Sequence, residues 1–394
     1  MLFFLLASFS FTIPLSKSIS AILLGAASLY ILIAAFLDPY SRERARAGLK
    51  GPLINALFLY TAVLGLGLFF SEDIMEGLDK VRSAFQLSLI YFAVSFFLHM
   101  ENGEGRDERR RLLISSFLAG MLILDSLGLM EYLGLIGERK YQILRPLGMH
   151  HIWFGNLNAV ALYGALALIF FQPGKYKLLG FASVLLALPS VLFAESRAVW
   201  FGIIITGTAS VLLLSGRRKT LFFIMVLVLL AGLLSFYQGS DVFRERMDQI
   251  GSDIALFRSG NAETSLGMRF KMWEAALDIF FSNPFFGAGT GDYKLLIGRM
   301  IASGEAPAFL GQYNQPHNVY LFLLATTGLP GLFAYLFIFY RGMRLSISRK
   351  KSLYGLLAFA VLLHYLIAGL SDTTSTQMIS YALALVLGVC LFKE

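Results

Sequence analysis

Long apolar stretches, each bounded by a short polar, glycine-containing or proline-containing segment, run through most of the chain. Each stretch is close to the roughly 20 residues that a helix needs to cross a bilayer. The pattern predicts twelve spans, at about residues 1–16, 19–37, 52–70, 82–99, 112–130, 152–171, 178–194, 198–215, 220–237, 317–340, 354–370 and 377–392. The first stretch lacks a basic N-terminal region and a clean cleavage site, so we interpret it as a span and not as a signal peptide.

Composition narrows the class of protein. Of the 394 residues, 57% are hydrophobic and 15% are charged, and the mean hydropathy is +0.69. Soluble domains carry about 25% charged residues, so this composition argues against a soluble enzyme. The predicted fold class is therefore an all-α polytopic membrane protein with about 12 transmembrane helices. Its single cysteine, Cys390, permits no intramolecular disulfide.

The distribution of charge indicates how the chain is oriented. Alternate loops and the C-terminal tail hold 19 of the 33 basic residues but only 7 of the 25 acidic ones. By the positive-inside rule these loops face the cytoplasm, and both termini lie with them. The net charge of +8 is then an orientation signal, and nucleic acid is not an expected partner.

One segment between predicted spans is much longer than the others. Residues 238–316 make up about 79 mostly polar residues on the outer side, where the remaining loops have at most about 20. We predict three regions: transmembrane helices 1–9 at residues 1–237, a helical outer loop at 238–316, and transmembrane helices 10–12 at 317–394. A large loop on a rigid scaffold is a natural place for an outward-facing active site.

Residues 268–281 of the outer loop have helical periodicity, and Ser282-Asn283-Pro284 then ends the helix. The predicted apolar stripe comprises Phe270, Trp273, Leu277, Phe280 and Phe281, opposite a solvated face of Lys271, Glu274 and Asp278. Arg269 lies at the margin of the stripe, where a charge is costly unless an anion meets it. An arginine that reaches lipid phosphates would give the same pattern.

Three more polar residues stand where predicted spans begin or end. Arg197 ends the seventh span, Asp372 follows the eleventh, and His317 opens the tenth. Plain structural roles remain open: an interfacial anchor or a partner of Glu195 for Arg197, and a helix cap for Asp372. Imidazole is the side chain best suited to proton transfer near neutral pH, so His317 is a candidate general base.

The other histidines and one glycine-rich loop carry weaker signals. Adjacent residues point apart, so His150-His151 does not favour a metal site, and no metal or other cofactor is predicted. His364, inside the eleventh span, is expected to make a helix–helix hydrogen bond. The loop Gly287–Gly291 resembles a phosphate loop but lacks the Lys-Ser/Thr ending and a preceding strand.

Several motifs together resemble a known family. His317-Asn318, nine residues and then Gly328-Leu-Pro-Gly331 follow a His-Asn-x9-Gly-x-x-Gly pattern. Further matches are Ser196-Arg197, Arg269-x-x-x-Trp273, Asn283-Pro-x-x-Gly287 and Asp372. With the long outer loop, the chain resembles the O-antigen ligase/polymerase superfamily of bacterial membrane glycosyltransferases. The resemblance in hydropathy covers essentially the whole chain, and the motifs cover about residues 197–372.

The resemblance implies a GT-C-like fold and a metal- and ATP-independent reaction. A completed glycan would pass, with inversion, from undecaprenyl pyrophosphate to a sugar hydroxyl of lipid A–core in lipopolysaccharide biosynthesis. This would occur on the periplasmic face of the bacterial inner membrane. The donor is already activated, so no cofactor is expected. The donor, the acceptor and the surrounding membrane lipids are the expected partners.

The resemblance also suggests roles for single residues. Arg197 and Arg269 would neutralise the leaving pyrophosphate through forked hydrogen bonds, in place of a metal. His317 would deprotonate the acceptor hydroxyl, or as an imidazolium would bind phosphate instead. Asp372 would orient or charge-balance one of these groups.

Four further residues receive supporting or peripheral roles. Asn318 and Trp273 would form a supporting shell around the substrate-binding groups. Lys80 and Arg82, near the outer end of the fourth span, are candidates for attracting the anionic donor, with interfacial anchoring as the alternative.

Two other functions remain open. In ligases the glycine motif is commonly followed by two threonines, whereas Leu332-Phe333 stand here, which favours a polymerase whose acceptor is a second lipid-linked glycan. The size near 400 residues and the dominant loop before the tenth span look more like a ligase. A flippase or transporter would place its polar residues in broken spans near the bilayer midplane. We expect an O-antigen ligase, with a polymerase as the main alternative.

Overall fold

The computed structural model describes residues 1–392 apart from 102, 137–142, 215–218, 373–376 and part of 221–240, and these residues form helices without strands. The N-terminal helices are α1 (Leu2–Thr12), α2 (Lys17–Leu37), α3 (Pro39–Leu49), α4 (Ile54–Gly67), η1 (Leu68–Phe70), α5 (Ile74–Leu98) and α6 (Gly103–Tyr132). Next come η2 (Pro146–Gly148), α7 (His151–Phe171), α8 (Gly174–Phe193), α9 (Arg197–Leu213), α11 (Asp241–Arg258) and α12 (Ser265–Ser282). The chain ends with α13 (Tyr293–Ala302), η3 (Ala308–Gln312), α14 (Val319–Ser348), α15 (Leu353–Ala368) and α16 (Gln377–Leu391).

The described helices are those of a membrane protein. Six of them, α2, α5, α6, α7, α8 and α14, are long and apolar enough to cross a bilayer, and the bent pair of α3 with α4–η1 would make a seventh. Four shorter apolar helices correspond to the predicted spans at 1–16, 198–215, 354–370 and 377–392. The predicted span at 220–237 lies mostly outside the described residues. The all-helical class is confirmed, whereas the count of twelve spans stays a prediction.

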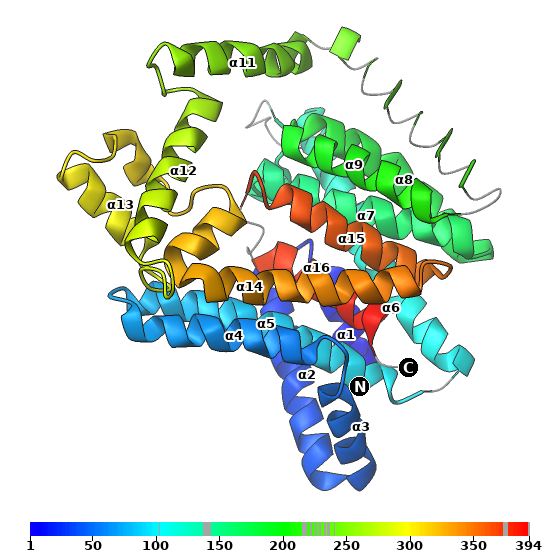
Figure 1. The fold of residues 1–394 in the computed structure, drawn as a ribbon. Coiled ribbons are helices and arrows are strands. Elements are labelled where there is room, and N and C mark those ends of the chain that lie inside the picture. The colour runs from blue at the N-terminus through cyan, green and yellow to red at the C-terminus, as the bar shows by residue number, and fades with distance from the viewer. Residues whose placement is uncertain are drawn as a thin grey trace.

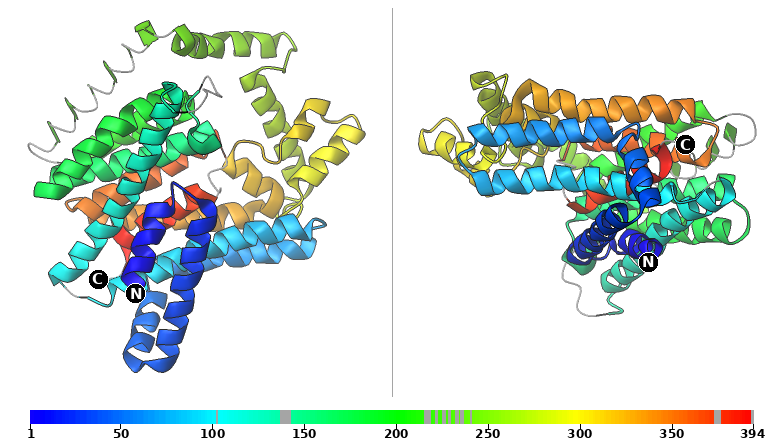
Figure 2. Two further views of the ribbon diagram at one scale, coloured as in Figure 1. Left: turned by 180° about the vertical axis from the view of Figure 1, so that it is seen from behind. Right: turned by 90° about the horizontal axis from the view of Figure 1, so that it is seen from below.

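Helix α16 lies at the centre of the bundle. It is apolar along its length, and almost every described side chain from Ile379 to Phe392 is buried. It packs against α5, α15, α7 and α6, while α14 lies between α4 and α15 (Figure 1). Helices α2 and α3 stand beside this bundle as a hairpin (Figures 1 and 2), and side chains such as Leu32 and Phe36 on α2 are exposed. Exposed apolar surface of this kind is what lipid would cover.

One buried histidine ties two helices together. The ring of His364 on α15 lies with Nε2 3.0 Å from Oδ1 of Asn156 and Nδ1 3.1 Å from the hydroxyl of Tyr163, both on α7. Because an amide oxygen only accepts, Nε2–H donates to Asn156 and Nδ1 accepts from Tyr163. The expected helix–helix hydrogen bond of His364 is thus confirmed.

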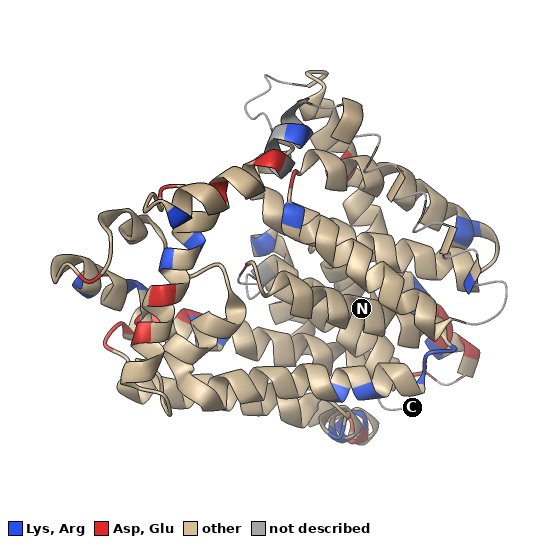
Figure 3. Cartoon of the chain, turned by 45° about the horizontal axis from the view of Figure 1, so that its top comes forward, with Lys and Arg blue, Asp and Glu red and all other residues tan. Residues whose placement is uncertain are grey.

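Helices α12, α13 and η3 form a second, smaller core at one end of the bundle (Figure 2). Buried side chains of α12, α13 and η3 pack there against the first turns of α14: Met272, Ala275, Ala276, Ile279, Tyr293, Ile297, Ala306, Leu310, Phe322 and Ala325. Charged residues concentrate on these outer helices and at helix ends, and the middle parts of the long helices carry almost none (Figure 3). The outer segment is therefore a docked unit whose polar face lies outside the apolar bundle.

Helix α14 is broken in its first half. Gly328 has φ 65° and ψ −161°, and Pro330 follows, so the helical hydrogen-bond ladder is interrupted there. The freed backbone amide of Leu329 donates to the carbonyl of Pro284 at 3.0 Å. A side-chain carbon at Gly328 would lie 2.5 Å from the carbonyl oxygen of Phe285. Glycine is therefore required at this break, both for its backbone angles and for the close approach of the outer segment.

Candidate active site

The residues at the start of α14 hold His317 in an unusual backbone position. His317 has φ 49°, in the left-handed region. The next residue, Asn318, caps α14: its side-chain oxygen accepts from the amides of Tyr320 and Leu321 at 3.0 and 3.1 Å. Its Nδ2 donates to the carbonyl of Leu370 at 3.1 Å, which fastens the start of α14 to the end of α15. Asn318 thus positions the histidine instead of pointing into the site itself.

His317 is paired with a buried carboxylate. Its Nδ1 lies 3.1 Å from Oδ1 of Asp372, which follows α15 and is 2% exposed. Because the carboxylate accepts, the proton is assigned to Nδ1, and Nε2 is left as the basic nitrogen. The other oxygen of Asp372, Oδ2, is buried and has no hydrogen-bond partner among the described residues. A histidine held by a carboxylate in this way can take a proton and have its cation stabilised.

Arg269 is the most electrostatically unusual cation of the outer segment. Burial on α12 lowers the pKa of its guanidinium, Asp372 raises it, Arg197 lowers it and Tyr313 raises it. Within the described part of the chain, no hydrogen bond or ion pair of Arg269 is found. These couplings place Arg269 near both Asp372 and Arg197, although the three residues are far apart in sequence. Asp372 favours the charge of Arg269 but forms no ion pair with it among the described residues, so an external anion would further offset the cost of burying this guanidinium.

Arg197 enters this cluster from the opposite side of the fold. It is the first residue of α9, after a tight turn in which Glu195 has φ 50°. The turn is held by His151 at the start of α7, whose Nδ1 donates to the carbonyl of Ala194 at 2.9 Å. The starts of α7 and α9 therefore lie side by side.

The outer helix α12 is fastened directly beside the histidine. Trp273 donates from Nε1 to the carbonyl of Pro316 at 3.0 Å, one residue before His317. The ring of Tyr313 meets that of His317 edge-on, with centroids 5.8 Å apart. The tyrosine hydroxyl also contacts the sulfur of Met268 at 3.3 Å. This arrangement holds α12, and Arg269 with it, against the start of α14.

The buried face of α12 differs from the predicted stripe. The helix and its end at Ser282 are as predicted, but its buried side chains are Met272, Ala275, Ala276 and Ile279. Phe281 is 70% exposed, so its place in a packed stripe was wrong. Small side chains let α12 approach α14 closely, and this close packing outweighs the larger aromatic surface. On the opposite face Glu274 and Asp278 are exposed as expected, and Lys271 pairs with Glu274 at 2.7 Å.

The glycine-rich loop 287–291 serves packing. Ala288 and Gly289 donate their amides to the carbonyls of Ala325 and Thr326 at 2.9 and 3.0 Å. A side-chain carbon at Gly287 would lie 2.4 Å from the backbone of Thr326 and Thr327. Two sequence motifs, the Asn-Pro-x-x-Gly run and the glycines of α14, therefore contact each other across the α14 break.

A second clamp fixes this loop to the turn between α4 and α5. Asp292 accepts from the hydroxyl of Ser71 and the amides of Glu72 and Asp73, each at 2.8 Å. Arg299 on α13 forms a two-pronged ion pair with Glu72 at 2.7 and 2.6 Å. Arg299 lowers the pKa of Glu72 through this contact.

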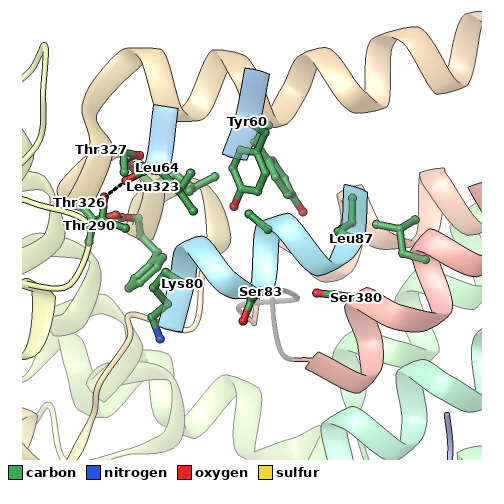
Figure 4. A pocket seen from close by; sticks show the side chains of 14 residues that line it. Tyr60, Leu64, Lys80, Ser83, Leu87, Thr290, Leu323, Thr326, Thr327 and Ser380 are labelled. Atoms are coloured by element: carbon green, nitrogen blue, oxygen red, sulfur yellow. Dashed lines mark hydrogen bonds between the residues drawn. The ribbon is translucent and has the colours of Figure 1, made fainter. Parts of the chain in front are cut away.

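The two cations predicted on α5 have different surroundings. Arg82 forms an ion pair with Asp79 on its own helix, and nothing in the described residues joins it to the His317 cluster. Lys80 pairs with Glu76 at 2.6 Å, and its ammonium lies 5.8 Å from the centre of the Phe322 ring. Lys80 also stands at one end of a pocket between α4, α5, α14 and α16 (Figure 4).

That pocket is mainly apolar. Its walls are formed by Tyr60, Leu64, Lys80, Ser83, Ala84, Leu87, Thr290, Phe322, Leu323, Thr326, Thr327, Tyr335, Ser380 and Leu383. Figure 4 shows Lys80 and Ser83 on α5 and Ser380 on α16 along the lower edge of the view, with Tyr60 of α4 above them. Phe322 is one helical turn beyond Asn318, so the pocket adjoins the start of α14.

The sequence did not point to Arg145 or Tyr313, which the structure places near His150 and His317 respectively. It suggested His150 only as a possible metal ligand. Among the described residues no group of three or more His, Cys, Asp or Glu side chains could hold a metal ion. His317, Asp372 and Arg145 all influence the charge of His150. Tyr313 could have been suggested by its position four residues before His317, whereas no local sequence feature indicates Arg145.

The fold and these contacts define a helical membrane protein in which a histidine–aspartate pair lies near Arg269, whose charge is also influenced by Arg197. Comparison with known proteins agrees with the motifs. Residues 181–336 match the family model described as O-antigen ligase, which confirms the resemblance and is consistent with a member of the O-antigen ligase superfamily. The match supports a function of the O-antigen ligase or polymerase kind, that is, a glycosyltransferase-like activity on lipid-linked glycans in general.

One curated relative extends the similarity beyond the matched domain. An uncharacterized protein of Haemophilus influenzae (strain ATCC 51907 / DSM 11121 / KW20 / Rd) is 24% identical over 333 residues. The alignment covers 83% of this chain and 79% of the relative. The similarity therefore spans most of both chains, and the relative's description adds no activity.

Proposed function

We propose that the protein is an O-antigen ligase that transfers a glycan from undecaprenyl pyrophosphate to lipid A–core. The observation that carries the proposal is the hydrogen bond of His317 to the buried Asp372, with Arg269 near enough to Asp372 and to Arg197 for both to influence its charge. The reaction requires a cationic site for the leaving pyrophosphate and a base for the acceptor hydroxyl. These four residues supply both functions within one cluster.

In the proposed reaction the acceptor hydroxyl gives its proton to Nε2 of His317. The oxygen attacks the anomeric carbon from the side opposite the pyrophosphate, and a new glycosidic bond forms with inversion. The old carbon–oxygen bond breaks, and its electron pair leaves with undecaprenyl pyrophosphate. Arg197 and Arg269 bind the departing charge, and Asp372 stabilises the imidazolium.

The pocket beside the site fits a lipid-linked donor. Its apolar walls suit a hydrocarbon chain, and Lys80 at its polar end is placed to attract a phosphate. In this proposal the site faces the periplasm from the inner membrane, with both termini in the cytoplasm, as the basic loops predict. The three-region division at 237 and 316 belongs to the same proposal.

The test is a product assay with purified protein in lipid nanodiscs, undecaprenyl-pyrophosphate glycan and lipid A–core. Glycan on lipid A–core, formed without ATP and in excess EDTA, is the expected product. Loss of activity that Mg²⁺ restores would contradict the metal-free mechanism.

A longer glycan still on undecaprenyl pyrophosphate would make the protein a polymerase. Leu332-Phe333 after the glycine motif is the feature that favours this alternative. Movement of the intact donor across the bilayer without any new glycosidic bond would instead identify a flippase. Product mass and a sidedness assay separate the three outcomes.

A further inference from the structure

A second pocket opens at the opposite end of α14 from His317. It has a volume of about 720 Å³, and it is formed by the first turns of α6, the end of α7 and the turn from α14 to α15. This turn lies on the side of the bundle away from α12 and α13 (Figure 1). The charged residues that line the pocket are Arg110, Arg349, Lys350, Lys351 and Asp107, which are four cations and one carboxylate.

Two arginines of this pocket are held by the C-terminal end of α16. Arg110 donates to the carbonyl of Cys390 at 3.3 Å, and Arg349 donates to the same carbonyl at 3.2 Å. Arg349 also donates to the carbonyl of Phe392 at 3.3 Å. Two guanidinium groups that share one acceptor repel each other, so the pocket has a positive potential before any ligand binds.

Asp107 is the one acidic side chain among the described residues that line the pocket. Its carboxylate lies 3.4 Å from Arg111, which does not line the pocket, and 3.9 Å from Arg110. Asp107 is therefore shared between two arginines of its own helix and does not balance the remaining cations.

Lys350 and Lys351 are the exposed cations of the pocket. Neither ammonium group has an ion pair or hydrogen bond within the described part of the chain. Helix α15 begins two residues later at Leu353, and the amides of a first helical turn have no intrahelical acceptor and carry the positive end of the helix dipole. An anion in the pocket would therefore meet two ammonium groups beside the positive end of α15.

Apolar surface adjoins these cations. Phe171 lines the pocket and is half-buried. Ile347, the residue before Ser348 of the pocket, is 45% exposed on α14. A free phosphate would use the cations alone, whereas a phospholipid would also cover the apolar surface with its hydrocarbon chains. The basic loops around the pocket are among those that the distribution of charge assigns to the cytoplasmic side.

We propose that this pocket binds the phosphate headgroup of an anionic phospholipid from the cytoplasmic leaflet, with Lys350 and Lys351 in contact with the phosphate. Arg110 and Arg349 keep their carbonyl partners on α16 and supply a fixed positive potential behind the lysines. The inference goes beyond the proposed glycan transfer and does not depend on it.

The experiment titrates the full-length protein in a neutral detergent with short-chain phosphatidylglycerol and measures the bound fraction by native mass spectrometry. The test variant is Lys350→Gln/Lys351→Gln. Removing both charges should weaken binding about 10–30-fold, because each lysine near an anionic headgroup contributes to binding separately. Thermal unfolding without lipid should match wild type, since both side chains are exposed.

Arg46→Gln/Lys50→Gln is the matched control. It removes two exposed basic side chains at the end of α3, outside the pocket. This control should bind phosphatidylglycerol as wild type does. Inorganic phosphate, titrated in parallel, should bind wild type more weakly than the lipid, because it cannot use the apolar surface.

Equal lipid affinity of wild type and the Lys350→Gln/Lys351→Gln variant would overturn the inference. An equal loss in both double variants would overturn it too, because the lipid would then respond to net charge and not to this pocket. Inorganic phosphate that binds as tightly as phosphatidylglycerol would assign the pocket to a soluble phosphate ligand instead. These readouts do not involve glycan transfer, so failure of the proposed function is tested separately by its own product assay.

Discussion

Two arginines near opposite ends of the bundle are buried in different ways. Arg110, 4% exposed on α6, donates to the carbonyls of Val389 and Cys390 at 2.7 and 3.3 Å. Its guanidinium lies 3.6 Å from the centre of the Tyr354 ring. Arg269 has no such partners among the described residues, and another cation, Arg197, disfavours its charge.

The difference separates a structural charge from one that awaits a ligand. Arg110 closes the C-terminal end of α16, where unsatisfied carbonyls and the helix dipole favour a cation. Asp372 favours the charge of Arg269 without pairing with it among the described residues, so an anion that binds there would compensate the rest of the desolvation. The hydrogen-bond partners of a buried arginine, and not its burial alone, thus distinguish a structural cation from a functional one.

The largest expected effect comes from removing the unpaired charge. Arg269→Ala should lower the rate of glycan transfer about 10²–10³-fold, because one preorganised contact to the leaving group is lost. Its thermal unfolding should match wild type, since no described protein contact is broken. The transfer rate of Arg269→Lys should lie between those of wild type and Arg269→Ala, because lysine keeps the charge but not the two-pronged hydrogen bonds of the guanidinium. Wild-type turnover in Arg269→Ala would show that Arg269 does not stabilise the leaving pyrophosphate.

Removing the hydrogen-bonded charge of Arg110 should have the opposite effects, with stability lowered and turnover kept. Arg110→Met removes the side-chain donor of the Val389 carbonyl, while Arg349 still donates to that of Cys390, and the loss should destabilise the protein by about 1–3 kcal/mol. Turnover per folded molecule should stay at the wild-type value. Thermal unfolding measures the stability, and active-site titration combined with the assay measures the turnover per folded molecule. A variant with normal stability and lost activity would contradict the contrast with Arg269.

The docking of the outer segment, on which the position of Arg269 depends, can be weakened at the α14 break. Gly328→Ala places a methyl group against the carbonyl of Phe285 at a positive φ, and should cost about 1–3 kcal/mol. Activity should fall together with protease resistance of residues 241–312. Gly25→Ala on α2, where a methyl group meets nothing within 4 Å, is the control. Equal stability of the two variants would show that the break tolerates a side chain.

The smallest expected effect concerns pH. The pKa of Glu72 is lowered below its ordinary 4.5 by Arg299, so this pair stabilises the fold above that pH and the stabilisation is lost as pH falls below it. Both side chains are largely exposed, so the effect should be slight. Thermal unfolding of wild type should decline slightly more between pH 6 and pH 3.5 than that of Glu72→Gln. If the stability of the two proteins declines equally with falling pH, the Glu72–Arg299 pair does not contribute to the stability of the fold.

Local patterns predicted much of this protein. Apolar stretches indicated the helical bundle, and the run Ser282-Asn283-Pro284 marked the end of α12 where the structure has it. The chemistry of the residue types singled out His317, Arg197 and Arg269 as candidates. The pattern predicted the wrong buried face for α12, because hydrophobicity alone does not reveal that small alanines will pack against α14.

Residue types and spacing by themselves determined a helical membrane protein, its family resemblance and its candidate site residues, because these depend on the period of a helix and the chemistry of single side chains. Only the tertiary structure decided that His317 would meet Asp372, 55 residues away, and that Arg269 would lie near both Asp372 and Arg197. Such convergence depends on how distant helices pack, which no local period encodes.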